Sequence, residues 1–177
     1  MQKKAHIWQI TGFFFTMVLG TALHFFYHWS NENNFIAWIS PVNESTWEHL
    51  KLLFTPFSFF TLIEYFSYGK YRTDFFLLKC KSVLLGMVSI IVLFYTYSGI
   101  LGTHFLFLDI LTFFISVFLS YSFCAKQLNK EDPFYKLNGL AGIVIFLFLI
   151  FLFILFTEKP PHINLFFDPA AQTYGRE

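Results

Sequence analysis

Three histidines and two carboxylates are the side chains of this sequence that could do chemistry together. His24 and His28 form an H-x-x-x-H pair, and on a helix this spacing places two imidazoles on neighbouring turns, where both can bind zinc. The motif "VNESTWEH" adds Glu44, Glu48 and His49, and carboxylates beside imidazoles act as general bases or as partners of metal ligands. We therefore predict a divalent metal such as zinc bound by His24, His28 and His49, with Glu48 or Glu44 as the general base.

Further polar side chains stand at the ends of apolar segments. Asp109 is predicted to orient the reacting groups. His104 lies about 140° away from Asp109 on an ideal helix, so the two are not expected to form a close pair. The other candidate site residues are Asn43, Lys51, His104, His162 and Asp168.

Each of these motifs also has a structural explanation. Ser45 and Glu48 fit the S-x-x-E capping box, in which Ser45 caps a helix and Glu48 accepts a hydrogen bond from the Ser45 backbone. Gly12 and Gly20 belong to a four-residue series, and small residues at that spacing let membrane helices pack closely. His28 could be an interfacial residue only. The sequence leaves the structural and the chemical explanations open.

The composition indicates an integral membrane protein. Of the 177 residues 56% are hydrophobic and 13% are charged, whereas about a quarter of the residues of a soluble protein carry a charge. The sequence contains no basic patch with interleaved aromatic residues, so it does not indicate a nucleic-acid partner. The expected partners are membrane lipids and a lipid or small-molecule substrate. The composition does not predict an oligomeric state.

Five apolar stretches are long enough to cross a hydrocarbon core of ~30 Å, which needs about 20 residues. We predict an all-α bundle in which residues 1–177 form a single transmembrane domain. The predicted spans are residues 7–29, 46–68, 79–101, 103–124 and 137–157, followed by an outer tail, residues 158–177.

Basic residues set the expected orientation, because short loops rich in Lys and Arg stay on the cytoplasmic side. In the five-span arrangement, all of the 12 Lys and Arg residues except Lys51, Lys159 and Arg176 fall on one side. The N-terminus is therefore predicted inside and the C-terminus outside, in a multi-pass protein of the cell membrane.

This orientation places the candidate site at the outer face. His24, Asp109 and Lys51 belong to three separate spans, and each would lie roughly 8 to 9 Å below a helix end. Ionisable side chains at such depth usually face the bundle interior or a wet cavity. The apolar tail segment "INLFFDP" predicts either a lid that carries His162 and Asp168 over this cavity or an interfacial anchor.

The stretches "HFFYHWS", "PVNESTWEHLKLLFTPF" and "LFFDP" resemble an uncharacterised family of small bacterial multi-pass membrane proteins, a domain of unknown function. The resemblance covers most of the chain, with V-N-E-S-x-W-E-H as its most specific motif. It implies a bacterial plasma membrane protein but no activity. It also implies that the family signature includes Asn43, Glu44, Trp47, Glu48, His49 and Asp168.

Two classes of function remain open. The first is a membrane-embedded, metal-dependent hydrolase or transferase that acts on a lipid or lipid-linked substrate. The alternative is a small carrier or solute-binding subunit that uses the same residues for substrate or proton binding. Glu64 favours the carrier if it faces the bundle interior, whereas it is a plain boundary residue if it lies at headgroup level beside Lys70 and Arg72. A haem protein with two axial histidines is a third alternative.

Overall fold

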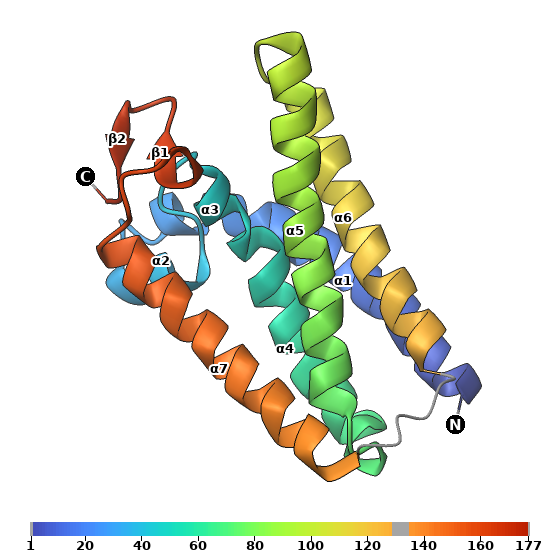
Figure 1. Cartoon of the computed structure of the whole chain (residues 1–177). Helices are drawn as coiled ribbons and strands as arrows, with labels where there is room; N and C mark the ends of the chain where they lie inside the picture. Colours follow the sequence, from blue (N-terminus) through green and yellow to red (C-terminus); the bar gives the residue numbers. More distant parts are fainter. Residues whose placement is uncertain (1, 129–134, 177) are drawn as a thin grey trace.

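The protein is described from a computed structural model, which covers residues 2–128 and 135–176, without the side chains of residues 2–4 and 135–138 (Figure 1). Within these ranges it is all-α apart from one short hairpin, which confirms the predicted class. The elements are α1 (Gln2–Trp29), α2 (Asn34–Ile39), α3 (Thr46–His49), α4 (Lys51–Ser67), η1 (Gly69–Tyr71), α5 (Phe75–Leu101), α6 (Leu106–Gln127), α7 (Tyr135–Glu158), η2 (Asn164–Phe166), β1 (Phe167–Asp168) and β2 (Thr173–Tyr174).

Among the described residues, four helices are long and apolar enough to cross a membrane. They are Ala5–Trp29 in α1, α5, α6 and Gly139–Glu158 in α7. The four helices overlap the predicted spans 7–29, 79–101, 103–124 and 137–157. Their length and composition indicate a multi-pass membrane protein, while the sides on which the termini lie stay a prediction.

The predicted span 46–68 differs from the other four. The structure divides it at Leu50 into α3 and α4, and α4 has only 17 residues. A helix of that length rises about 25 Å, which is less than a hydrocarbon core of ~30 Å. Among the described residues there are thus four candidate spans, and a crossing by residues 46–68 stays a prediction.

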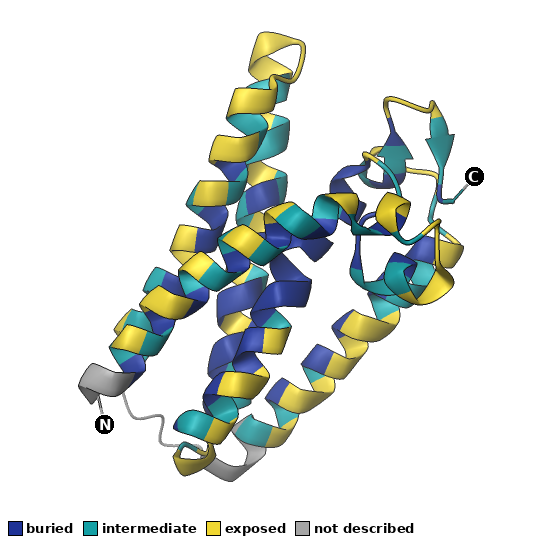
Figure 2. Cartoon of the chain, turned by 180° about the vertical axis from the view of Figure 1, so that it is seen from behind, coloured by how far each residue is buried: buried dark blue, intermediate teal, exposed yellow. Residues whose placement is uncertain are grey.

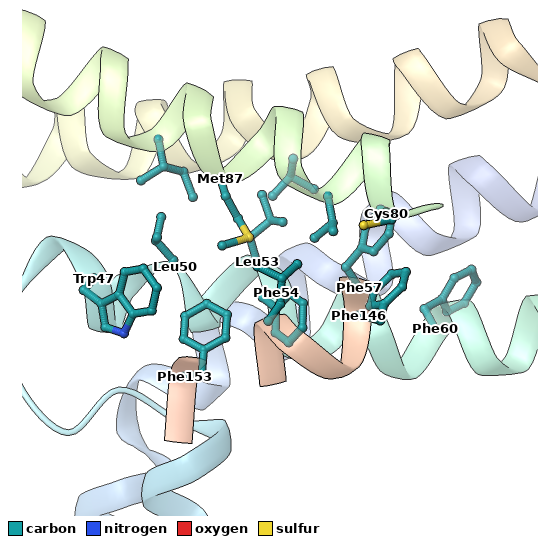
Figure 3. Packing of buried hydrophobic residues seen from close by; sticks show 14 of the residues in the cluster. Trp47, Leu50, Leu53, Phe54, Phe57, Phe60, Cys80, Met87, Phe146 and Phe153 are labelled. Atoms are coloured by element: carbon teal, nitrogen blue, oxygen red, sulfur yellow. The ribbon is translucent and has the colours of Figure 1, made fainter. Parts of the chain in front are cut away.

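Helix α4 forms the centre of the bundle. It lies between α7 on one side and α1 and α6 on the other, and it is the most deeply buried helix in the view of Figure 2. Leu53, Phe54, Phe57 and Phe60 of α4 belong to the main hydrophobic core, which also includes side chains of α5, α6 and α7 (Figure 3). Burial of one helix by several others explains why α4 can be short and still be stable.

Both ends of α4 carry buried ion pairs. Near one end Lys51 pairs with Glu48 of α3 at 2.6 Å, and near the other end Glu64 pairs with Lys79 of α5. All four side chains are at most 4% exposed. Ionisable groups inside a membrane protein are costly unless they are paired, so each charge here lies beside its opposite.

The small residues that recur every four positions on α1 serve helix packing. A Cβ atom at Gly20 would lie 2.4 Å from the carbonyl oxygen of Leu52 in α4, and one at Gly12 would lie 2.5 Å from the Tyr121 ring. Pro56 lacks the backbone N–H that would bond the Leu52 carbonyl within the helix. Small residues on α1 therefore let it approach α4 closely, which confirms the packing explanation of these glycines.

The helices α5 and α6 form a hairpin that closes at Gly102. Gly102 ends α5 with φ 71°, and its N–H donates to the Ser98 carbonyl over 2.8 Å. Glycine adopts this left-handed conformation without strain, which explains a sharp end at this residue. Helix α6 begins at Leu106, so His104 lies in the connection and not on the helix.

The tail folds back onto α3. Its hairpin pairs Phe167 with Tyr174 and Asp168 with Thr173, and Figure 1 places it at the α3 end of the bundle. The Phe166 ring lies 5.0 Å from the Trp47 ring, centroid to centroid. The tail is thus an ordered cover over α3, held by buried aromatic contacts.

We expect Gly20→Ala to lower the thermal stability of the protein, because the new methyl group collides with the Leu52 backbone, which a side-chain rotation cannot relieve. Overpacking of this kind costs about 1–3 kcal/mol of unfolding free energy. The measurement is the melting temperature of the purified protein in detergent. Gly99→Ala is the matched control, since a Cβ atom at Gly99 meets nothing within 4 Å. Equal melting temperatures for the two variants would contradict the close approach of α1 and α4.

Candidate metal centre

The loop before α3 is built around Ser45. The Ser45 hydroxyl accepts a hydrogen bond from the Glu48 N–H at 3.4 Å, which confirms the predicted N-cap. The reciprocal bond of the capping box is absent from this loop: the Ser45 N–H donates to Asn43 Oδ1, and Glu48 accepts from the Val42 N–H instead. The predicted hydrogen bond from the Ser45 backbone to Glu48 was therefore wrong. The Glu48 carboxylate also accepts a hydrogen bond from Lys51, which the capping pattern does not include.

The structure brings together three of the predicted residues from three segments. His24 comes from α1, Glu44 from the loop and His49 from the end of α3. The Nε2 atoms of His24 and His49 lie 3.8 Å and 3.4 Å from the two Glu44 carboxylate oxygens. One ligand atom from each residue lies within 4.8 Å of the other two, and this group is partly exposed.

The ring of His49 is already oriented. Its Nδ1 lies 2.9 Å from the Ser45 carbonyl oxygen, which can only accept a hydrogen bond, so Nδ1 carries the proton. A neutral ring then has its lone pair on Nε2, the atom that faces Glu44. A protonated ring instead donates to Glu44 through Nε2–H: burial lowers the pKa of His49, but the hydrogen bonds to Glu44 and Ser45 outweigh it and raise that pKa. A backbone carbonyl on the far nitrogen is a common way to orient a metal-binding histidine.

The ring of His24 lies beside that of His49, with 5.4 Å between the ring centroids. His24 Nδ1 is buried and has no hydrogen-bond partner among the described residues. A buried nitrogen without a partner costs free energy and requires an explanation. An ion bound at Nε2, the atom that faces Glu44, would leave Nδ1 as an N–H without an acceptor, so the unsatisfied atom does not itself support a ligand-binding role for His24.

The electrostatics of the group favour a positive charge at its centre. The pKa of the Glu44 carboxyl is held below its ordinary value, first by the hydrogen bond from His49 and then by the charges of the neighbouring histidines, against the partial burial that raises it. A carboxylate that stays ionised beside two imidazoles can share a cation with them. That cation is either a proton or a metal ion.

The geometry is close to that of a zinc site. Zn–N and Zn–O bonds of ~2.0–2.2 Å around a tetrahedral ion place neighbouring ligand atoms roughly 3.3–3.6 Å apart. His49 Nε2 has this distance from one Glu44 oxygen, and His24 Nε2 lies 3.8 Å from the other oxygen; one ligand atom from each of the three residues lies within 4.8 Å, so the group would contract slightly around an ion. Two imidazoles and one carboxylate also leave a fourth position open, as catalytic zinc sites do.

The tail holds the loop that carries Glu44. Asp168 Oδ2 accepts from the Glu44 N–H at 3.2 Å, while Asp168 Oδ1 accepts from the backbone of the hairpin turn. The Asn43 amide donates to the Gly175 carbonyl at 2.9 Å. Asn43 and Asp168 therefore position Glu44 through contacts between residues more than 120 positions apart.

Several predicted site residues lie outside the group. His28, one turn further along α1, is exposed, and the described metal-binding group does not include it. His162 stacks on Tyr174 at 4.6 Å. The expectation that His104 and Asp109 do not pair was wrong: His104 Nδ1 lies 3.2 Å from Asp109 Oδ2, because His104 precedes α6 and ideal helical angles do not apply to it.

Asp109 itself forms a second polar cluster with the hydroxyl of Tyr97, which donates to its carboxylate. Its negative charge also acts on His49. The sequence reasoning missed Tyr97. The only available signal was its place near the end of the preceding span, close to the hairpin connection.

Glu48 and Lys51 belong to a separate buried network. The Lys51 ammonium donates to Glu48 and to Thr157 of α7, each at 2.6 Å, and to the Ala37 carbonyl at 2.8 Å. Thr157 also contacts Glu48 at 3.1 Å. Glu48 is therefore engaged in joining α2, α3, α4 and α7. A role as general base stays a prediction.

The described helices indicate a multi-pass membrane protein, and the partly exposed His/Glu group is a candidate metal centre at one end of its bundle. Residues 1–176 match a family described as a family of unknown function (DUF6512), and the chain belongs to that family. No curated protein and no solved structure matches the chain.

We expect Glu48→Gln to destabilise the fold strongly, because it leaves the buried Lys51 ammonium without its counter-charge. Removal of one partner of a buried ion pair costs about 3–5 kcal/mol of unfolding free energy. Thermal unfolding in detergent, followed by circular dichroism, measures the effect.

The matched control is the double variant Glu48→Gln with Lys51→Met, which removes both charges. Replacement of a whole buried pair is often neutral, so the double variant should regain most of the lost stability. If Glu48→Gln alone unfolds at the wild-type temperature, the network does not hold these helices together.

Proposed function

We propose that the protein binds a divalent metal ion such as zinc through His24, Glu44 and His49, and that this site is the active centre of a membrane-embedded hydrolase or transferase. The observation that carries the proposal is the convergence of three ligand atoms within 4.8 Å from three separate segments. The orientation of His49 by the Ser45 carbonyl supports it.

The residues have distinct roles in this proposal. His24 and His49 bind the ion as neutral imidazoles, and Glu44 adds a negative charge that keeps it bound. A divalent ion with an open position supplies a water nucleophile at neutral pH. Asp168 holds the Glu44 loop in place, and Asp109, whose carboxylate contacts Tyr97 and His104, is assigned an orienting role.

The site lies at a helix end, so its substrate is one presented at the membrane surface. We assign it a lipid or lipid-linked substrate, since the adjoining surface of the helices is apolar. We assign this end to the outer side of a bacterial plasma membrane, as the distribution of Lys and Arg over the five-span arrangement favours, and we take V-N-E-S-x-W-E-H, which contains Glu44, Glu48 and His49, as the family signature.

The test is the metal content of the protein purified without chelator, measured by inductively coupled plasma mass spectrometry. We expect Glu44→Gln and His24→Gln to lose the bound zinc, because each removes one of three ligands. Glu44 is exposed, so its variant should keep the melting temperature of the metal-free wild type.

His28→Gln is the matched control. It removes an imidazole from the same helix, one turn away, that lies outside the described group. Loss of zinc from His28→Gln to the same extent as from His24→Gln would instead support the ligand pair expected from sequence. Metal-free wild-type protein that also fails to take up added zinc would refute the metal centre.

A carrier is the second candidate function, and the burial of Glu64 favours it. Glu64 faces the bundle interior at 0% exposure, which is the condition under which it favours a carrier. Gln9, Tyr68 and Lys79 surround it: Tyr68 donates to its carboxylate at 2.8 Å, and the Lys79 ammonium contacts the Gln9 amide oxygen at 3.1 Å. Ionisable groups at both ends of α4 are a feature of proton-coupled carriers.

The double variant Glu64→Leu with Lys79→Leu separates a carrier from a structural ion pair. Removal of both charges should preserve the fold, since no buried charge remains unpaired. If the pair relays protons, proteoliposomes of the double variant should lose proton uptake, read from an enclosed pH-sensitive dye under an imposed potential. Wild-type proteoliposomes with no uptake above protein-free liposomes would argue against the carrier.

A further inference from the structure

An apolar groove opens between α4 and α7, with a volume of about 400 Å³. Its floor is formed by Phe54, Phe146 and Phe153, whose rings contact one another across the two helices (Figure 3). Its edges include Leu62 and Leu147, which are both exposed. The groove therefore opens sideways, toward the space that surrounds the bundle.

The groove is as long as one membrane leaflet is deep. On α7 its lining runs from Ile143 to Phe153, a rise of about 15 Å and half of a hydrocarbon core of ~30 Å. This stretch lies inside the candidate span Gly139–Glu158. The opening consequently faces hydrocarbon when α7 crosses a membrane.

One end of the groove has the residue types that are typical of the lipid headgroup level. Trp38 of α2 lines it, and the indole N–H donates to Glu158 at 3.2 Å. Arg176 donates to the same carboxylate at 2.7 Å. Tryptophan and charged side chains at the end of a span are typical of the membrane interface. The groove thus begins at the interface and continues into one leaflet.

We propose that this groove binds one acyl chain of a phospholipid from the leaflet at the α3 end of the bundle. This binding site is independent of the candidate metal centre, since none of His24, Glu44 and His49 lines the groove.

Size selects an acyl chain over a protein helix. A volume of about 400 Å³ spread over about 15 Å gives a cross-section of roughly 27 Å², whereas a helix ~10 Å wide needs roughly 80 Å². A single hydrocarbon chain fits the smaller value. A helix of a second copy of the protein does not.

The lining also disfavours water. The hydroxyl groups of Thr55 and Thr61 donate to the carbonyls of Ile39 and Phe57, both at 2.8 Å, and so offer no free proton to a water molecule. An empty apolar groove would forfeit dispersion contacts along its whole wall. An acyl chain restores those contacts along the apolar wall, while one hydroxyl of the lining, that of Ser58, has no hydrogen-bond partner among the described residues.

The test is native mass spectrometry of the full-length protein released from nanodiscs of phosphatidylethanolamine and phosphatidylglycerol. We expect the wild type to retain one phospholipid. Ser58→Phe places a ring in the groove and should retain about tenfold less, which corresponds to ~1.4 kcal/mol of binding free energy. Ser89→Phe is the matched control: Ser89 is a partly exposed serine of another apolar helix, α5, and does not line the groove.

A second measurement keeps the proposal testable if Ser58→Phe fails to fold. A phospholipid with a photoreactive diazirine in its acyl chain should cross-link the wild type within residues 54–62 and 143–153. Equal retention by the two folded variants, cross-links spread evenly over the exposed helix faces, or a dimer joined across the groove would each overturn the proposal.

Discussion

The ammonium group of Lys51 connects four helices of this protein. It is fully buried, and it donates to the Ala37 carbonyl of α2, to Glu48 of α3 and to Thr157 of α7 while belonging to α4 itself. A charge without water is stable only when its hydrogen bonds are complete. The position of α2, α3 and the end of α7 relative to the bundle therefore depends on this one group.

The candidate metal centre and the apolar groove both lie beside this network. Glu48 precedes His49 of the candidate metal centre, and α2 carries Trp38 of the groove between α4 and α7. The short helix α4 has one buried ion pair near each of its ends. Because α4 is buried by its neighbours rather than by lipid, it can carry charged residues that an isolated span of this length could not.

The candidate metal centre combines rigid and adjustable parts. His24 is fixed on the long helix α1 and His49 is oriented by the Ser45 carbonyl, whereas Glu44 lies on a loop that the tail holds through Asp168. Such a division suits a site that must admit a substrate. The helices set the position of the imidazoles, and the loop brings the carboxylate to them.

The sequence by itself determined the class of the protein, the four long apolar helices and the residue types of the site. Hydrophobic composition and span length are local properties, so they are readable without a fold. The N-cap at Ser45 was predictable for the same reason, since it depends on four consecutive residues.

Only the tertiary structure decided how the polar residues are grouped. His28 has the same residue type and spacing signal as His24, yet only His24 reaches Glu44, because the crossing of α1 over α3 selects one turn of the helix. Glu48 and Glu44 are equivalent in the sequence, but Lys51 and Thr157 bind one of them and the histidines face the other. These choices depend on how separate segments meet: His24 and Glu44 are 20 positions apart, and Thr157 and Glu48 are 109 positions apart, so no local pattern contains them.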